Sequence, residues 1–177
     1  MQKNFFVLFF LISCIFFNPL ICNSKSIFPS KGEIAPNFEL PGYLNGENKR
    51  SLYTLDKFKG SKLVIYFYPE DFTAGCSLEA KGFSSNLKSF KKLNTNIIGI
   101  SSDNIDEHVD FCGKENIKYP LLSDLNGVTS SEYGSWSGTY SNRNTFLLDE
   151  DGVILTRWIG VNPLHHAEEV ITFISQT

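Results

Sequence analysis

The 177-residue sequence is poor in the residue types that bind metals or cross-link chains. It contains four cysteines, three histidines and a single methionine. His165 and His166 are adjacent, and no cysteine or acidic cluster lies at ligand spacing from them, so we predict no metal site. No glycine-rich phosphate loop occurs, and we therefore expect no nucleotide or other cofactor.

Strongly basic segments and low-complexity tracts are also lacking. Sixteen Lys and Arg residues oppose nineteen Asp and Glu residues, which gives a formal net charge of −3. Proteins that bind nucleic acid usually carry a basic patch or stripe. We therefore predict no nucleic-acid partner, and interpret the sequence as a compact, mildly acidic domain.

One long apolar run is present, at the N-terminus. Residues 5–17 read FFVLFFLISCIFF, and Lys3 precedes them. A short apolar run behind a basic start is typical of an export signal and is too short to span a bilayer comfortably. We interpret residues 1–24 as a leader, 25–32 as a connector and 33–177 as one domain, exported to the periplasm or to a lumenal or organellar compartment. An uncleaved leader that anchors the protein in a membrane is the alternative.

The positions of the cysteines limit the possible functions further. Cys14 and Cys22 fall within the leader, which leaves Cys76 and Cys112 in the domain. Two cysteines in an exported protein often form one structural disulfide. A structural bond and a reactive pair therefore both remain open at this point.

Strands and helices are predicted to alternate along the domain. Residues 63–68 (LVIYFY) and 96–101 (NIIGIS) are apolar on both faces, which favours central strands covered on both sides. Further strands are predicted at 33–40, 51–55, 120–123, 145–148 and 153–158, with a turn at Pro41-Gly42 and helices at 76–93, from 105, at 127–133 and at 164–175. This order is typical of an α/β thioredoxin-like fold, a mixed central β-sheet flanked by helices on both faces.

Cys76 stands at the start of the helix predicted after the strand at 63–68. Unpaired backbone N–H groups converge at a helix N-terminus and favour a thiolate over a thiol. Gly75 leaves room for another group to approach, and Thr73 places a hydroxyl three residues before the sulfur. The loop therefore has the composition of a reactive-cysteine site.

This loop resembles the active-site loop of the peroxiredoxins. The pattern is Pro69-x-x-x-Thr73-x-x-Cys76, and residues 63–79 (LVIYFYPEDFTAGCSLE) are most similar to the peroxiredoxin Q or bacterioferritin comigratory protein branch of the AhpC/TSA superfamily. Two later motifs, Ser123-Asp124 and Arg143-x-Thr145-Phe146, extend the similarity over residues 33–177. The resemblance implies a thiol-specific peroxidase that reduces hydrogen peroxide and organic hydroperoxides to water and alcohols, in antioxidant defence and redox homeostasis.

The resemblance also assigns roles to individual residues. Cys76 is implied to be the peroxidatic nucleophile, which becomes a sulfenic acid. Arg143 is implied to stabilise the thiolate and the departing oxygen, and Thr73 to bond the sulfur or the peroxide. Pro69 is implied to shield the sulfur from solvent. Glu79 either orients the arginine or only complements the helix dipole.

The resolving thiol is assigned in the same way. Many members of the branch carry a second cysteine five residues after the first, where this chain has Lys81. Another arrangement places it on the following helix, which Cys112 matches, although by periodicity alone Cys112 is a buried apolar residue beside Ile105 and Val109. The resemblance thus implies an intramolecular Cys76–Cys112 disulfide that thioredoxin reduces. Because both cysteines would lie on helices, we expect both helices to open locally on oxidation.

Three other functions stay open on the sequence. A thiol–disulfide oxidoreductase usually requires Cys-x-x-Cys, and Thr73 occupies the place of its first cysteine. A non-enzymatic thioredoxin-like interaction domain with a structural disulfide would make no use of Arg143. A one-cysteine peroxidase would use an outside thiol instead of Cys112. By resemblance we expect a monomer that meets membranes only through its leader.

Overall fold

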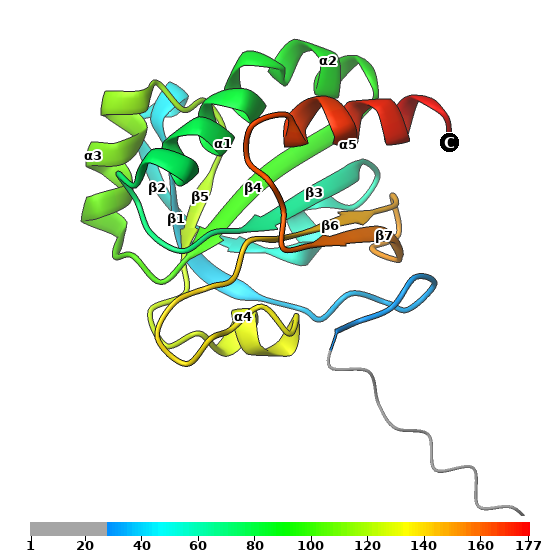
Figure 1. Cartoon of the computed structure of the whole chain (residues 1–177), viewed down its shortest axis with the longest axis horizontal. Helices are drawn as coiled ribbons and strands as arrows, with labels where there is room; N and C mark the ends of the chain where they lie inside the picture. Colours follow the sequence, from blue (N-terminus) through cyan, green and yellow to red (C-terminus); the bar gives the residue numbers. More distant parts are fainter. Residues whose placement is uncertain (1–27) are drawn as a thin grey trace, which may run out of the picture.

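The computed structural model describes residues 28–177, so the predicted leader and the first residues of the connector lie outside the described residues. None of the helices within residues 28–177 is long and apolar enough to cross a membrane. Seven strands form one mixed sheet in the order β2-β1-β5-β4-β3-β6-β7 (Figure 1). The predicted α/β class is therefore confirmed.

The bounds of the elements follow the chain in an alternating order. The strands are β1 (Glu39–Leu44), β2 (Lys49–Thr54), β3 (Lys62–Phe67), β4 (Thr95–Ser101), β5 (Leu121–Ser123), β6 (Asn144–Leu148) and β7 (Ile154–Ile159). The helices are α1 (Ala74–Ser85), α2 (Leu87–Lys92), α3 (Ile105–Glu115), α4 (Val128–Glu132) and α5 (His166–Ser175), with short 3-10 turns η1 (Asn45–Glu47) and η2 (Leu55–Phe58).

Strand β3 lies inside the sheet, as its continuous apolar sequence predicts. It pairs in parallel with β4 and antiparallel with β6. Successive side chains of a strand point to opposite faces. Accordingly Val64 and Tyr66 enter one hydrophobic core, whereas Ile65 and Phe67 enter the other.

The two faces of the sheet are covered unequally. Helices α1, α2, α3 and α5 lie over one face (Figure 1). Both Cys76 and Cys112 belong to the core beneath them. The opposite core is closed by η2, the residue Tyr133 that follows α4, and the segment from Phe28 to Phe38. Helices do flank both faces, as predicted, but four of the five α-helices found within residues 28–177 share one of them.

The predicted first strand is wrong in its bounds. Residue Ile34 makes only an isolated bridge with Val153, and β1 instead runs through Pro41-Gly42, which we had predicted as a turn. The close packing of neighbouring side chains explains this use of glycine in a strand. A Cβ on Gly42 would lie 2.3 Å from Leu122 Cδ2, so the side-chain space there is already filled.

The predicted single helix at 76–93 is divided in two. Helix α1 begins at Ala74 and ends at Ser85, and α2 begins at Leu87. Asn86 lies between them and donates from Nδ2 to the carbonyl of Gly82. Hydrogen bonds from a side chain to the backbone compete with the bonds that would continue the helix. The spacing of apolar residues gives no sign of such a bond, so the break could not be predicted from it.

We expect Gly42→Ala to lower the free energy of unfolding by about 1–3 kcal/mol, because the added methyl group overpacks the site against Leu122. Gly46→Ala is the matched control, since nothing lies within 4 Å of a Cβ at that position. Denaturant unfolding of both variants measures the difference. Equal stability of the two would contradict the assignment of Gly42 to tight strand packing.

Candidate active site

Cys76 lies where the central strand passes into the helical layer. Strand β3 ends at Phe67, and Cys76 is the third residue of α1, with 1% of its surface exposed. The first intrahelical bond in this turn runs from the Ser77 N–H to the Thr73 carbonyl, at 2.9 Å. The N–H groups before Ser77 have no carbonyl partner within the helix, so this end of α1 carries partial positive charge.

The register of β6 brings Arg143 to the same point. Asn144 pairs with Phe67, so the residue before it lies beside the loop that leaves β3. Arg143 Nη2 donates to Cys76 Sγ at 3.2 Å. Gly75 makes this approach possible, because a Cβ there would lie 3.2 Å from the same Nη2 atom.

Glu79 holds the other side of the guanidinium. The carboxylate is 1% exposed, and its Oε2 accepts a hydrogen bond from Arg143 Nη1, whereas its Oε1 has no partner. Burial raises the pKa of Glu79 to about 7, although Arg143 opposes the shift. Partial burial alone would lower the pKa of Arg143, but the charges of Glu79 and Cys76 raise it above its ordinary value.

Thr73 and Pro69, the other two residues predicted to act at this site, lie in the segment between β3 and α1. Thr73 is the N-cap residue of α1, and its hydroxyl donates to the carbonyl of Glu70 at 3.1 Å. The hydroxyl proton of Thr73 therefore points at the loop. The hydroxyl oxygen can still accept a hydrogen bond from a neighbouring group through a lone pair. Pro69 is half-buried, directly after Tyr68.

Cys112 lies in the last turn of α3 as a free thiol, and Cys76 is free as well. No part of Cys112 is exposed. Burial, together with the charge of Asp71, raises the pKa of the Cys112 thiol to about 12. Lys81, which stands where many relatives have a cysteine, forms an ion pair with Glu115 at the end of α3, at 2.5 Å.

The sequence analysis missed a buried polar pair beside these cysteines. Asp71 lies in the loop before α1, and its Oδ2 is 2.8 Å from His108 Nδ1 on α3, with both side chains at most 1% exposed. The available signal was helical spacing, because His108 falls three residues after Ile105 and four before Cys112 on the stripe predicted to be buried.

His166 is also buried, at the start of α5. Its Nε2 lies 2.8 Å from Thr145 Oγ1 and its Nδ1 lies 3.1 Å from Glu169 Oε2. Burial lowers the pKa of His166, against the opposing charge of Glu169. These contacts fix α5 to strand β6 and give the histidine a packing role.

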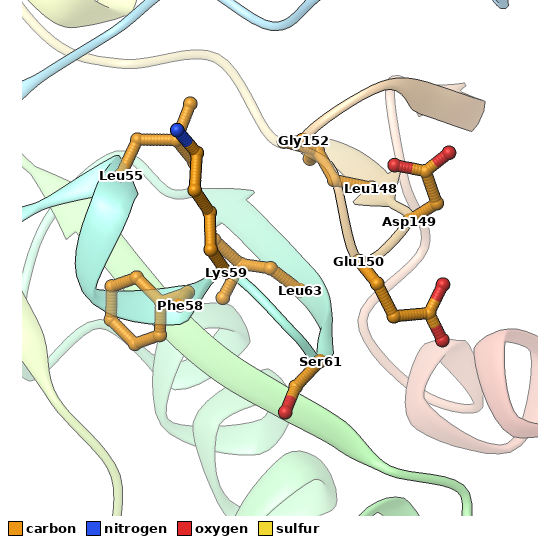
Figure 2. Close-up of a pocket in the computed structure, with 9 residues that line it drawn as sticks. All are labelled: Leu55, Phe58, Lys59, Ser61, Leu63, Leu148, Asp149, Glu150 and Gly152. Atoms are coloured by element: carbon orange, nitrogen blue, oxygen red, sulfur yellow. The ribbon is translucent and has the colours of Figure 1, made fainter.

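A small cavity lies at the opposite end of β3 from Cys76 (Figure 2). It is lined by Leu55, Phe58, Lys59, Ser61, Leu63, Leu148, Asp149, Glu150 and Gly152. None of these lining residues is a cysteine, histidine or arginine. This cavity therefore offers no thiol to a peroxide.

Comparison with known proteins agrees with this geometry. Residues 31–157 match the family model of the AhpC/TSA family. The chain is 36% identical over 148 residues to a peroxiredoxin of Coxiella burnetii designated bcp, which covers 79% of this chain and 95% of that protein. It is 37% identical over 140 residues to chloroplastic peroxiredoxin Q of Oryza sativa subsp. japonica, which covers 77% of this chain and 60% of that protein.

Solved structures give the same result. Peroxiredoxin Q of Xanthomonas campestris is 32% identical with a TM-score of 0.69, and the match covers 77% of this chain and 90% of that one. The reduced 2-Cys peroxiredoxin of Plasmodium vivax is 26% identical with a TM-score of 0.77, over 82% and 94% of the two chains. This chain therefore belongs to the AhpC/TSA family, in its peroxiredoxin Q branch, and is a thiol peroxidase.

Proposed function

We propose that Cys76 is the peroxidatic cysteine and Cys112 the resolving cysteine of an atypical 2-Cys peroxidase. The observation that carries the first assignment is the contact between Arg143 Nη2 and Cys76 Sγ at 3.2 Å, in a buried site at a helix N-terminus. Only a thiolate is a strong nucleophile, and a fixed guanidinium favours that charged form. Residues 33–177 form the catalytic domain in this proposal.

The peroxidatic step follows from this arrangement. The Cys76 thiolate attacks one oxygen of the hydroperoxide, the S–O bond forms and the O–O bond breaks. The departing oxygen carries negative charge until it takes a proton and leaves as water or an alcohol. Arg143, held by Glu79, supplies a preorganised charge for that oxygen, and the lone pair of Thr73 is available to orient the peroxide. Pro69 shields the sulfur from bulk water.

The resolving step requires movement. The Cys112 thiol attacks the sulfenic sulfur of Cys76, the S–S bond forms, and the oxygen leaves as water. In the reduced fold Cys112 is fully buried on an intact helix and its pKa is about 12, so it is a poor nucleophile there. These properties support the local opening of α3 before the disulfide forms.

A dithiol protein such as thioredoxin then reduces the disulfide and completes the cycle. We propose hydrogen peroxide and organic hydroperoxides as substrates, a monomer as the active form, and export through the leader to the periplasm or to a lumenal or organellar compartment. The name of the rice relative places that protein in the chloroplast, which supports the organellar alternative for this one.

We expect one equivalent of hydrogen peroxide to convert the reduced protein into a form two hydrogens lighter, with the link mapped to Cys76 and Cys112. Intact mass and peptide mapping measure this change. The Cys112→Ser variant should instead gain one oxygen on Cys76, and Cys76→Ser should not react rapidly. A free Cys112 in the oxidised native protein would contradict the resolving assignment and favour a one-cysteine mechanism.

We expect Arg143→Gln to lower the second-order rate constant for peroxide by about 10²–10³-fold, because the variant loses a charged donor at the reacting atoms. Stopped-flow measurement of sulfenic acid formation gives this constant. Arg157→Gln is the control, because Arg157 donates to the backbone carbonyls of Phe28 and Pro29, on the side of the sheet away from the cysteines. Equal losses in both variants would contradict a specific role of Arg143.

The titration of Glu79 predicts a pH-dependent stability. Its pKa is about 7 in the folded protein against an ordinary value of 4.5, so between these values the folded state binds more protons than the unfolded state. The contribution of this group to stability therefore falls as the pH rises through that window, by roughly 3 kcal/mol in total.

Glu79→Gln removes this titration and keeps an oxygen for Arg143. The variant should gain stability relative to the native protein as the pH rises from about 4 to about 8, as measured by denaturant unfolding. Below about pH 4 the difference in stability between the variant and the native protein should no longer change with pH, because the Glu79 carboxyl is protonated in both the folded and the unfolded state. A difference between the two proteins that does not change with pH would contradict the raised pKa.

A further inference from the structure

The loop before α1 and the helix that carries Cys112 are joined by a buried hydrogen bond that the peroxidase chemistry does not use. His108 Nδ1 on α3 lies 2.8 Å from Asp71 Oδ2, and the two side chains are 0% and 1% exposed. The loop residue lies five positions before Cys76, and the helix residue lies four positions before Cys112. One bond therefore connects the backbone near the first cysteine with the helix of the second.

Other groups hold Asp71 in place. Tyr68 donates from its hydroxyl to Asp71 Oδ1 at 2.8 Å, and the Asp71 N–H donates to Asp103 Oδ2 at 2.9 Å. Asp71, Asp103 and His108 offer atoms within 4.8 Å of one another, but both oxygens of Asp71 already have partners. The atoms of Asp71 that face its neighbours are thus already paired within the protein.

The next residue of the loop adds a second contact to α3. Phe72 packs edge-on against Phe111, with ring centroids 5.3 Å apart, and the ammonium of Lys114 lies 5.1 Å from the centroid of the Phe72 ring. The backbone of Phe72 has φ 61°, a left-handed conformation that is costly for a residue with a side chain. The loop is thus held in a strained backbone conformation while the ring of Phe72 packs against Phe111, the residue before Cys112.

We propose that the contacts of Asp71 with His108 and of Phe72 with Phe111 form a clasp that sets the rate at which Cys112 reaches Cys76. The proposal rests on the disulfide mechanism above. Asp71, Phe72 and His108 act through the position of α3, and are therefore positioning residues. While the clasp is closed, Cys112 stays buried.

The clasp matters because the sulfenic acid has two competing fates. Attack by the Cys112 thiol gives a disulfide and water. Attack by the sulfenate on a second hydroperoxide gives a sulfinic acid and water or an alcohol, and that product is not reversed by thiols. A slower opening of α3 lengthens the life of the sulfenic acid, so a tighter clasp means greater sensitivity to excess peroxide.

A rival role for His108 predicts the opposite effect. Its Nε2 is buried and has no hydrogen-bond partner among residues 28–177, and the residue lies one helical turn before Cys112. If this nitrogen took the proton from the Cys112 thiol, replacing His108 would slow disulfide formation. If His108 acts as part of a clasp, replacing it leaves the Asp71 carboxylate buried without its partner, loosens α3 and speeds the same step.

The experiment measures the two steps separately by rapid acid quench and mass spectrometry after mixing the reduced full chain with hydrogen peroxide. The variants are His108→Leu and Phe72→Asn. Phe72→Asn leaves no buried charge without a partner, and asparagine tolerates the positive φ of this position. We expect conversion of sulfenic acid to disulfide to be about tenfold faster in each variant, equivalent to ~1.4 kcal/mol, with formation of the sulfenic acid unchanged.

The control variant is Asp106→Asn, which removes an exposed ion pair between α3 and Arg50. Such a pair contributes little, so its resolving rate should stay within about twofold of the native value. The clasp variants should also yield less sulfinic acid than the control at excess peroxide. Unchanged or slower resolution in the folded variants would overturn the clasp, and Phe72→Asn decides alone if His108→Leu does not fold.

The same measurement separates the two levels of inference. If the native chain forms no Cys76–Cys112 disulfide, the proposed mechanism fails and the clasp falls with it. If the native chain forms the disulfide and both variants resolve at the native rate, only the clasp is wrong. Faster resolution in both variants, with an unaltered control, supports the clasp.

Discussion

The proposed chemistry depends on the position of one guanidinium group. Arg143 reaches Cys76 only because β6 pairs with β3 in the register that sets Asn144 against Phe67. Its charge is useful there because the site is buried and the local dielectric is low, which strengthens each electrostatic contact. The same burial makes the carboxylate of Glu79 costly to ionise, so the two groups depend on each other.

The second half of the cycle depends on the opposite property, which is inaccessibility. Cys112 is protected from reaction in the reduced fold by full burial and by a thiol pKa of about 12. In the proposed mechanism this burial keeps Cys112 from reacting until α3 opens. Its release is then a conformational event, and the proposed clasp between α3 and the loop would influence the chemistry without contact with the peroxide.

The sequence predicts the parts of this fold that depend on local pattern. The apolar run of β3, the strand pair β6 and β7 and the cysteine at a helix start can all be predicted from residue order. Contacts between distant segments are not readable in that way, which is why the Asp71–His108 pair was missed. Likewise, Gly42 resembles a turn residue in sequence, but the structure uses it to admit the side chain of Leu122.

The division of the interior into two cores has a consequence for turnover. Both cysteines belong to the core on the four-helix side of the sheet, whereas Phe67, Phe146 and Tyr133 belong to the other. In the proposed cycle the opening of α3 disturbs only the core that contains the cysteines, because the second core lies on the other face of the sheet. That intact core would keep the sheet in shape as a template on which the helix reforms after reduction, so a partial unfolding could be repeated in every cycle.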